Sequence, residues 1–195
     1  MQSERRAVEV RPVCNPCIVV DAARVLLSQC TTFVGDVPDA VYTAESQVMP
    51  GGTVGKHLRH VVDHYSAILR GRRDATVIDY DHRERDVPME NCRDSARRTL
   101  TGVAEEIASL AERDMHAPVR VRVMVSGDGA ETELVSSLAR ELAFATHHAV
   151  HHQAMMRAIA GEFGVEASAD FGKAPSTINH EVVKAGADGR PGGAR

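Results

Sequence analysis

Apolar residues recur every three to four positions along four separate stretches of the chain, which is the spacing of an amphipathic helix. Residues that favour helix ends accompany them. Asn15 and Pro16 suit the start of the first helix, Thr53 can cap the second, and the second and fourth stretches stop near Gly71 and Gly164. The predicted helices cover residues 16–33, 53–71, 91–114 and 137–163.

Residues 119–125 break this pattern, because apolar and basic side chains alternate there with the period of a half-buried strand. A Ser-Gly-Asp-Gly turn follows at 126–129, and residues 131–135 can return as a second strand. The predicted fold is therefore all-α, a four-helix bundle with a small β-hairpin before the fourth helix.

The length of 195 residues is typical of one domain, which we expect to span residues 15–181. Residues 1–14 show no periodicity and are predicted to be an irregular lead-in. The glycine-rich tail at 182–195 is predicted to be disordered.

Composition and charge restrict the function. The net charge is −4, aromatic residues make up 4% of the chain and tryptophan is absent. These values argue against nucleic acid as a partner, because such proteins usually carry a basic face or a stacking platform. Inspection finds no run of about 18 apolar residues and no apolar signal-peptide core, so we expect no membrane segment and a cytoplasmic protein.

Four cysteines occupy positions 14, 17, 30 and 92. Cys14-Asn-Pro-Cys17 is similar to a thioredoxin-type redox motif, but the βαβ context of such motifs is missing. Zinc would require a second ligand pair, and the chain has no other CxxC. We therefore interpret these two cysteines as structural residues beside a helix cap.

Seven histidines gather in two predicted helices: His57, His60 and His64 in the second, and His147, His148, His151 and His152 in the fourth. Spacings of three, four and seven residues place imidazoles on one helical face. Two such faces predict a metal site between facing helices. Imidazole ligands would suit Zn, Fe, Ni or Cu. The apolar periodicity by itself slightly favours His57 over His60 as the ligand from the second helix.

The segment His57-Leu-Arg-His60-Val-Val-Asp63-His64, with His148-Ala-Val-His151-His152 some eighty residues later, resembles the DinB-like (YfiT-like) superfamily of metalloenzymes. The resemblance covers roughly residues 15–180. It implies a DinB/YfiT-like four-helix bundle that holds one divalent transition metal ion with a histidine triad. Carried over by motif, the ligands would be His60, His148 and His152.

The same resemblance implies diverse chemistry. Some members resemble transferases or isomerases that use a low-molecular-weight thiol as cosubstrate, and this is the reaction class we expect, with a small-molecule substrate. This chain departs from the family motif after the paired histidines, where it has Gln153-Ala-Met-Met in place of Arg-Gly-Gln. Metal-dependent hydrolysis is the enzymatic alternative. The second alternative is a non-catalytic, stress-related metal-binding bundle, which could form a homodimer through a helix face.

The remaining histidines and one loop supply further candidates. His57, His64 and His151 are candidate catalytic residues, either as proton shuttles or as groups that orient the ligands. His147 and His151 could instead face solvent. The loop at 72–90 is long, and its Tyr80, Asp81 and Arg83 are candidate substrate-binding residues. A solvated, salt-bridged loop is the alternative interpretation.

Overall fold

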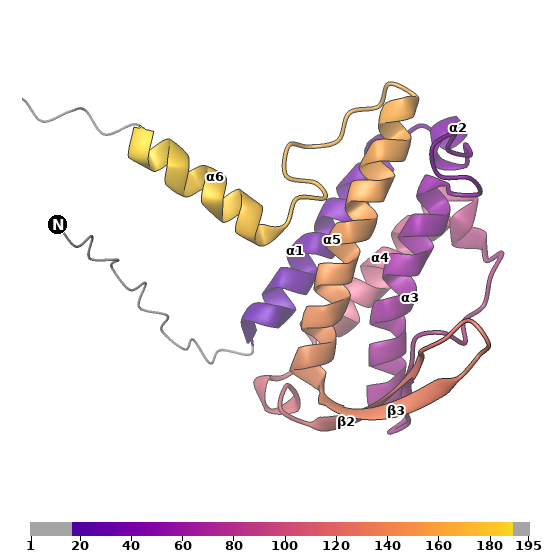
Figure 1. The fold of residues 1–195 in the computed structure, drawn as a ribbon, viewed down its shortest axis with the longest axis vertical. Coiled ribbons are helices and arrows are strands. Elements are labelled where there is room, and N and C mark those ends of the chain that lie inside the picture. Colours follow the sequence, from indigo (N-terminus) through magenta and orange to yellow (C-terminus); the bar gives the residue numbers. More distant parts are fainter. Residues whose placement is uncertain (1–16, 189–195) are drawn as a thin grey trace, which may run out of the picture.

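The computed structural model describes residues 17–188, and most of them are helical. Four long helices dominate: α1 (Cys17–Asp36), α3 (Val54–Arg73), α4 (Arg93–Ala108) and α5 (Leu138–Glu162). Helix α1 packs against α4 and α5, and α3 packs against the same two helices (Figure 1). The mainly helical fold predicted from the periodicity is confirmed.

Helix α1 is the most apolar of the four. Its buried stripe runs through Ala23, Leu27, Cys30 and Val34, spaced three or four residues apart, and lies wholly in the core. By length and hydropathy this helix could also cross a membrane, which the inspection of the sequence overlooked. A core helix passes the same test, so the observation is weak evidence for a membrane span.

Helices α3 and α5 begin where their capping residues predicted. The Thr53 hydroxyl accepts a hydrogen bond from the Lys56 amide at 3.1 Å, and the Ser137 hydroxyl accepts one from the Arg140 amide at 3.3 Å. Each bond satisfies an amide that the first helical turn leaves unpaired. Near the end of α5, Met156 is fully buried and Met155 is half-buried.

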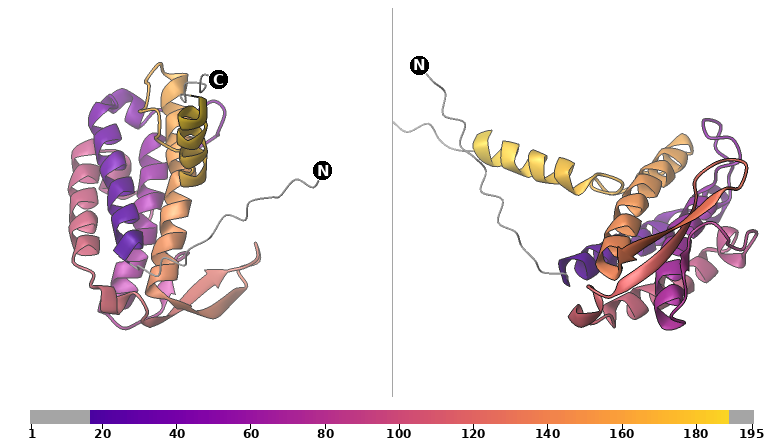
Figure 2. Two further views of the ribbon diagram at one scale, coloured as in Figure 1. Left: turned by 90° about the vertical axis from the view of Figure 1, so that its left-hand side faces the viewer. Right: turned by 60° about the horizontal axis from the view of Figure 1, so that its bottom comes forward.

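A three-stranded sheet lies near the end of the helices where α5 begins (Figures 1 and 2). Strands β2 (Pro118–Met124) and β3 (Glu131–Ser137) form the predicted antiparallel hairpin. Strand β1 (Ile78–Asp79) pairs in parallel with β2 and was not predicted, because two residues are too short to show a period. Gly71 allows this approach, since a Cβ there would lie 2.7 Å from the Ile78 Cγ1 atom.

The connections contain more structure than the sequence indicated. The 36–52 connection includes the short helix α2 (Asp39–Tyr42), and two 3₁₀ turns form at η1 (Pro88–Glu90) and η2 (Glu112–Asp114). The third helix was predicted to reach residue 114 but ends at Ala108. Leu110 and Met115 are both buried beyond that end, so the chain turns to bring both side chains to the core.

Helix α6 (Pro175–Asp188) follows α5 and carries no buried residue over 175–185. Residues 182–188, which were predicted to belong to a disordered tail, are helical here. Pro175 is suited to the first helical turn, and the single Gly186 does not outweigh the helix formers around it. The predicted lead-in at 1–14 and the rest of the tail lie outside the described residues.

Candidate metal centre

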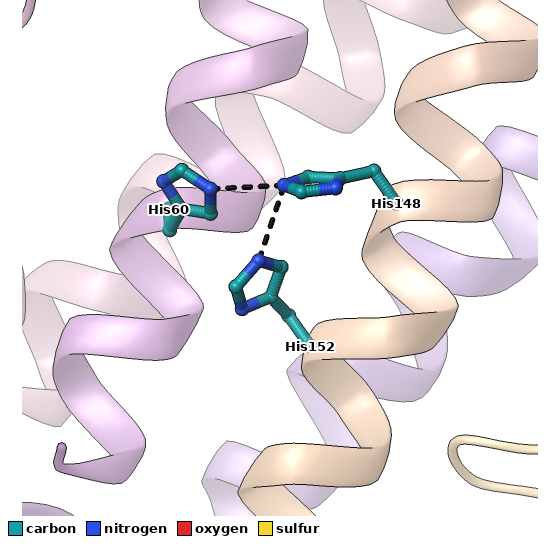
Figure 3. Close-up of side chains that lie close together, drawn as sticks. All are labelled: His60, His148 and His152. Atoms are coloured by element: carbon teal, nitrogen blue, oxygen red, sulfur yellow. Dashed lines mark hydrogen bonds between the residues drawn. The ribbon is translucent and has the colours of Figure 1, made fainter. Parts of the chain in front are cut away.

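Three histidines converge between α3 and α5 (Figure 3). His60 comes from α3, whereas His148 and His152 stand one turn apart on α5. The Nε2 atom of His148 lies 2.9 Å from that of His60 and 3.1 Å from that of His152. One nitrogen of each ring lies within 4.8 Å of the other two, so this group could hold a metal ion.

Burial keeps these imidazoles neutral. Loss of solvent is the main cause, reinforced by neighbouring imidazoles, and it lowers the pKa of His60 to about 2. The same causes lower the pKa of His152 to about 3 and that of His148 to about 4. A neutral imidazole has the free lone pair that a metal ligand needs, so near pH 7 these nitrogens are ready to bind a cation.

The spacing also fits a metal ion. Four tetrahedral ligands at 2.0–2.1 Å from a zinc ion are about 3.3 Å apart. The two separations that involve His148, 2.9 and 3.1 Å, need only a small movement to reach that value. Imidazole suits Zn, Fe, Ni and Cu alike, so the donor set does not select among these ions.

His57 and His64, predicted as supporting residues, both contact the triad. The Nδ1 atom of His57 lies 3.0 Å from the Nδ1 atom of His152, on the side of that ring away from His148. His64 is buried, its Nδ1 lies 2.9 Å from the His60 carbonyl oxygen, and its ring centroid lies 4.2 Å from that of His148. Burial is the main cause that lowers the pKa of both.

The other two histidines of α5 lie at the periphery. His151 is exposed, and its ring centroid lies 5.4 Å from that of His152. His147 is exposed as well. A proton relay through His151 stays a prediction, while His57 and His64 have the more direct contacts with the triad.

The loop residues predicted to bind substrate have different surroundings. Tyr80 is buried; its ring stacks on His64, and its hydroxyl donates to the Glu141 carboxylate at 2.7 Å. Burial and this carboxylate raise the pKa of Tyr80 well above its usual range. The Asp81 carboxylate accepts a hydrogen bond from the Met124 amide at 2.7 Å, which ties the loop to the hairpin.

The charge of Arg83 acts on three of the clustered histidines, and that of Asp81 acts on His64. The Arg83 charge helps lower the pKa of His60, His64 and His148, which places the guanidinium within electrostatic reach of the triad. It also lies 3.6 Å from the Asp63 carboxylate. Of the three loop residues, Arg83 retains the strongest case for a role at the site.

A buried ion network beside the triad was not foreseen. Arg59 donates to the Glu90 carboxylate at 2.8 Å and lies 3.4 Å from that of Asp63. Gly55 lets this form, because a Cβ there would lie 2.0 Å from the Glu90 carbonyl oxygen of η1. The i, i+4 spacing of Arg59 and Asp63 could have indicated their ion pair, whereas nothing in the sequence indicated the contact of Arg59 with Glu90 of η1. The network holds the 81–90 loop against α3.

Two pockets lie on different sides of the triad. The first, which we call the basic pocket, has a volume of about 430 Å³ and includes His60 and His152 in its wall. Its other side chains and backbone come from Met49, Pro50, Gly51, Gly52, Lys56, His57 and Arg59. The lining contains no carboxylate, so this pocket suits an anionic or polar small molecule.

The second, which we call the apolar slot, has a volume of about 390 Å³ and lies between the hairpin and α5. Its lining consists of Tyr80, Val121, Val123, Leu134, Val135, Ser136, Arg140, Glu141 and Phe144. Phe144 stacks on His148 with ring centroids 5.8 Å apart. Sequence reasoning missed Phe144, although it stands one helical turn before His148 on α5.

Cys30 and Cys92 lie outside this centre. Cys30 is buried and accepts a hydrogen bond from the Gln153 side chain at 3.5 Å, and Cys92 is an exposed thiol. Cys14 lies outside the described residues, so the interpretation of the Cys14–Cys17 pair stays a prediction.

Comparison with known proteins decides the family. The model of the DinB superfamily matches residues 25–156, which include all three histidines of the triad. The chain belongs to the DinB superfamily. Membership of the DinB superfamily and the three-histidine group together fit a metal-binding protein.

A protein of Rhizopus delemar named FK506-binding protein 5 is also similar to this chain. The two are 31% identical over 118 residues. The match covers 60% of this chain but 31% of the fungal protein, so the chain spans less than a third of that relative's length. The name of that protein says nothing about a histidine triad.

Proposed function

We propose that this protein is a metal-dependent enzyme that transfers or isomerises small molecules with the help of a low-molecular-weight thiol. The observation that carries the proposal is the convergence of three neutral imidazole nitrogens, two of which, from His60 and His152, belong to the wall of the basic pocket. Three protein ligands with room for a further ligand are typical of catalytic rather than structural sites. His60, His148 and His152 would hold one divalent transition metal ion.

A bound metal ion would lower the pKa of a coordinating thiol, so that the nucleophile is available near neutral pH. The surrounding histidines would support this. If His152 binds through Nε2, its Nδ1–H points at His57 Nδ1 and can donate to it, which orients the His152 ring. The analogous bond from His64 to the His60 carbonyl fixes the His64 ring beside His148.

The basic pocket would bind the cosubstrate. Lys56 and the half-buried His57 face it, and an anionic group on a thiol would find no carboxylate there to repel it. The thiol loses its proton, its sulfur forms a bond to an electrophilic carbon, and the leaving group departs with the bonding electron pair. In an isomerisation, the sulfur adds and later leaves. The thiol proton passes to solvent, because the one lone pair of neutral His57 already accepts the hydrogen bond from His152.

The remaining features of the proposal follow from family membership and composition. The four long helices would correspond to the four-helix bundle of the superfamily. The partners would be small molecules rather than nucleic acid, and a cytoplasmic location would keep a thiol cosubstrate reduced.

Metal content, measured by inductively coupled plasma mass spectrometry, is the first test. We expect near-stoichiometric metal in the wild type, and none in His60→Ala or in the double variant His148→Ala/His152→Ala. His147→Ala is the matched control, because His147 is exposed on the same helix and should not affect the metal. Absence of metal after reconstitution of the wild type would overturn the proposal.

Turnover of model electrophiles with and without added thiol is the second test. Turnover that requires the thiol supports the transferase or isomerase. Turnover of esters or amides without thiol would instead establish the hydrolase, because the same site could activate water. A metal-loaded protein that shows no turnover, and whose metal spectrum is unchanged by thiol, would be a non-catalytic binding protein.

A further inference from the structure

The apolar slot exists because the hairpin leaves part of its inner face unfilled. Val121 and Leu134 are paired across β2 and β3, so their side chains share one face of the sheet. Val121 is only 4% exposed, whereas Leu134 is 53% exposed. The face is therefore packed against the core at Val121 and open at Leu134, where the slot lies.

A single layer of aromatic rings lies between the apolar slot and the histidine triad. Phe144 stacks on His148, and Tyr80 stacks on His64 with centroids 4.9 Å apart. Phe144 and Tyr80 also contact each other, at 5.5 Å between centroids. A molecule in the slot that reaches past the edge of Phe144, which is 37% exposed, would meet the His148 side of the triad.

The buried polar groups of the slot are paired with one another. The buried Glu141 carboxylate accepts hydrogen bonds from the Tyr80 hydroxyl at 2.7 Å, the Ser136 hydroxyl at 2.5 Å and Arg140 at 3.0 Å. The Arg140 guanidinium also lies over the Phe144 ring, 5.4 Å from its centroid. No charge is left without a partner among the slot residues, so a ligand gains mainly by burying apolar surface.

We propose that the apolar slot binds the apolar part of the electrophilic substrate, a small neutral aromatic or alkyl compound, and that Phe144 sets which substrates reach the triad. This inference rests on the proposed function, since it assigns the second substrate of the same centre. The volume of about 390 Å³ is within the range of small-molecule pockets. The charged cosubstrate and the neutral electrophile would then approach the metal ligands from different sides.

The test is a titration of the metal-loaded protein with indole, followed by NMR of the leucine and valine methyl groups. We expect saturable shifts at Val123 and Leu134, with a dissociation constant on the order of 1 mM or below. Leu134→Asn places an amide in the slot and should weaken indole binding about tenfold or more. Val125→Asn is the matched control, because Val125 lies on the same hairpin, is 62% exposed and does not line the slot.

Sodium benzenesulfonate is the charged comparison and should shift the slot methyls much less than indole does. The slot assignment is overturned if indole shifts none of the slot methyls, if benzenesulfonate binds equally well, or if Leu134→Asn binds indole like the wild type. Metal content is measured on the same samples. If the wild type retains its metal but does not bind indole, only the slot is refuted. If the wild type binds indole but holds no metal, only the proposed enzyme is refuted.

Discussion

The two helix pairs of this protein are built for different purposes. The core stripe of α1 and that of α4 are apolar throughout, and the α4 stripe consists of Ala96, Leu100, Val103 and Ile107. Helices α3 and α5 instead bury polar groups, among them His64, His152, Thr146 and Gln153. Burying polar groups costs free energy unless each is hydrogen-bonded. The packing of α3 and α5 therefore depends on specific hydrogen bonds, whereas the packing of α1 and α4 depends on how well apolar side chains fit together.

The hydrogen bonds of the α3–α5 half illustrate this dependence. The Tyr65 hydroxyl donates to the Thr146 hydroxyl at 3.2 Å, and Gln153 donates to the Leu26 carbonyl oxygen at 3.2 Å. The triad itself brings three neutral imidazoles together in a partly desolvated place, which a metal ion would satisfy. The comparison teaches that all four long helices contribute apolar core, whereas the polar contacts of the candidate centre come from α3 and α5.

Removal of the metal should produce the largest effect. A metal present at a thousand times its dissociation constant stabilises the folded state by about 4 kcal/mol. Chelation of the loaded wild type should therefore lower Tm by on the order of 10 °C. In His148→Ala/His152→Ala the chelator should leave Tm unchanged, as differential scanning calorimetry can check. Equal shifts in both proteins would contradict a role for the triad in metal binding.

Truncation of a core residue in the other half should separate stability from chemistry. Leu27 of α1 is fully buried, so Leu27→Ala should lower the free energy of unfolding by about 2–5 kcal/mol through lost burial and a residual cavity. Metal content per folded molecule should stay at the wild-type value. Denaturant unfolding together with metal analysis gives both quantities. A loss of metal comparable to that of the histidine variants would show that the two halves are not independent.

The difference in pH dependence between metal-free wild type and metal-free His60→Ala should be the smallest effect, about 1 kcal/mol at pH 5.5. The folded-state pKa values of about 2, 3 and 4 for His60, His152 and His148 lie below the ordinary value of 6.5. Between these limits the unfolded chain binds protons that the folded chain does not, so stability falls as the pH decreases below about 6.5.

Thermal unfolding of the metal-free protein between pH 7.5 and 5.5 checks this expectation. Tm should decrease with pH in the wild type and decrease less steeply in His60→Ala, because one of the strongly shifted groups is gone. Val25→Ala, at an exposed position of α1, should keep the wild-type slope. An identical slope in His60→Ala and the wild type would argue against the depressed pKa of His60.

Much of the fold was predictable because its signals are local. Helical periodicity located all four long helices, and alternation located the hairpin. Strand β1 and the turn η1 were not predicted, because each is two or three residues long and forms only where another element approaches it. The early end of α4 has the same origin, since the chain beyond Ala108 turns to bury Leu110 and Met115.

Part of the candidate site was also predictable from the sequence. The i, i+4 spacing of His148 and His152 indicated a pair on one face, and the choice of His60 over His57 came from the family motif rather than from periodicity. The contact of His57 with the outer nitrogen of His152 depends on how α3 and α5 are placed against each other. No spacing within one helix contains that information.

The sequence alone therefore determined the helices, the hairpin and the set of residues from which a metal centre could be made, because propensity and periodicity act over a few neighbouring residues. The family motif named the three imidazoles, but only the tertiary structure showed how closely they approach one another, how strongly burial lowers their pKa values, and where the basic pocket and the apolar slot lie. These properties depend on distances between residues such as His60 and His148, 88 positions apart in the chain, and on the solvent that packing excludes between them.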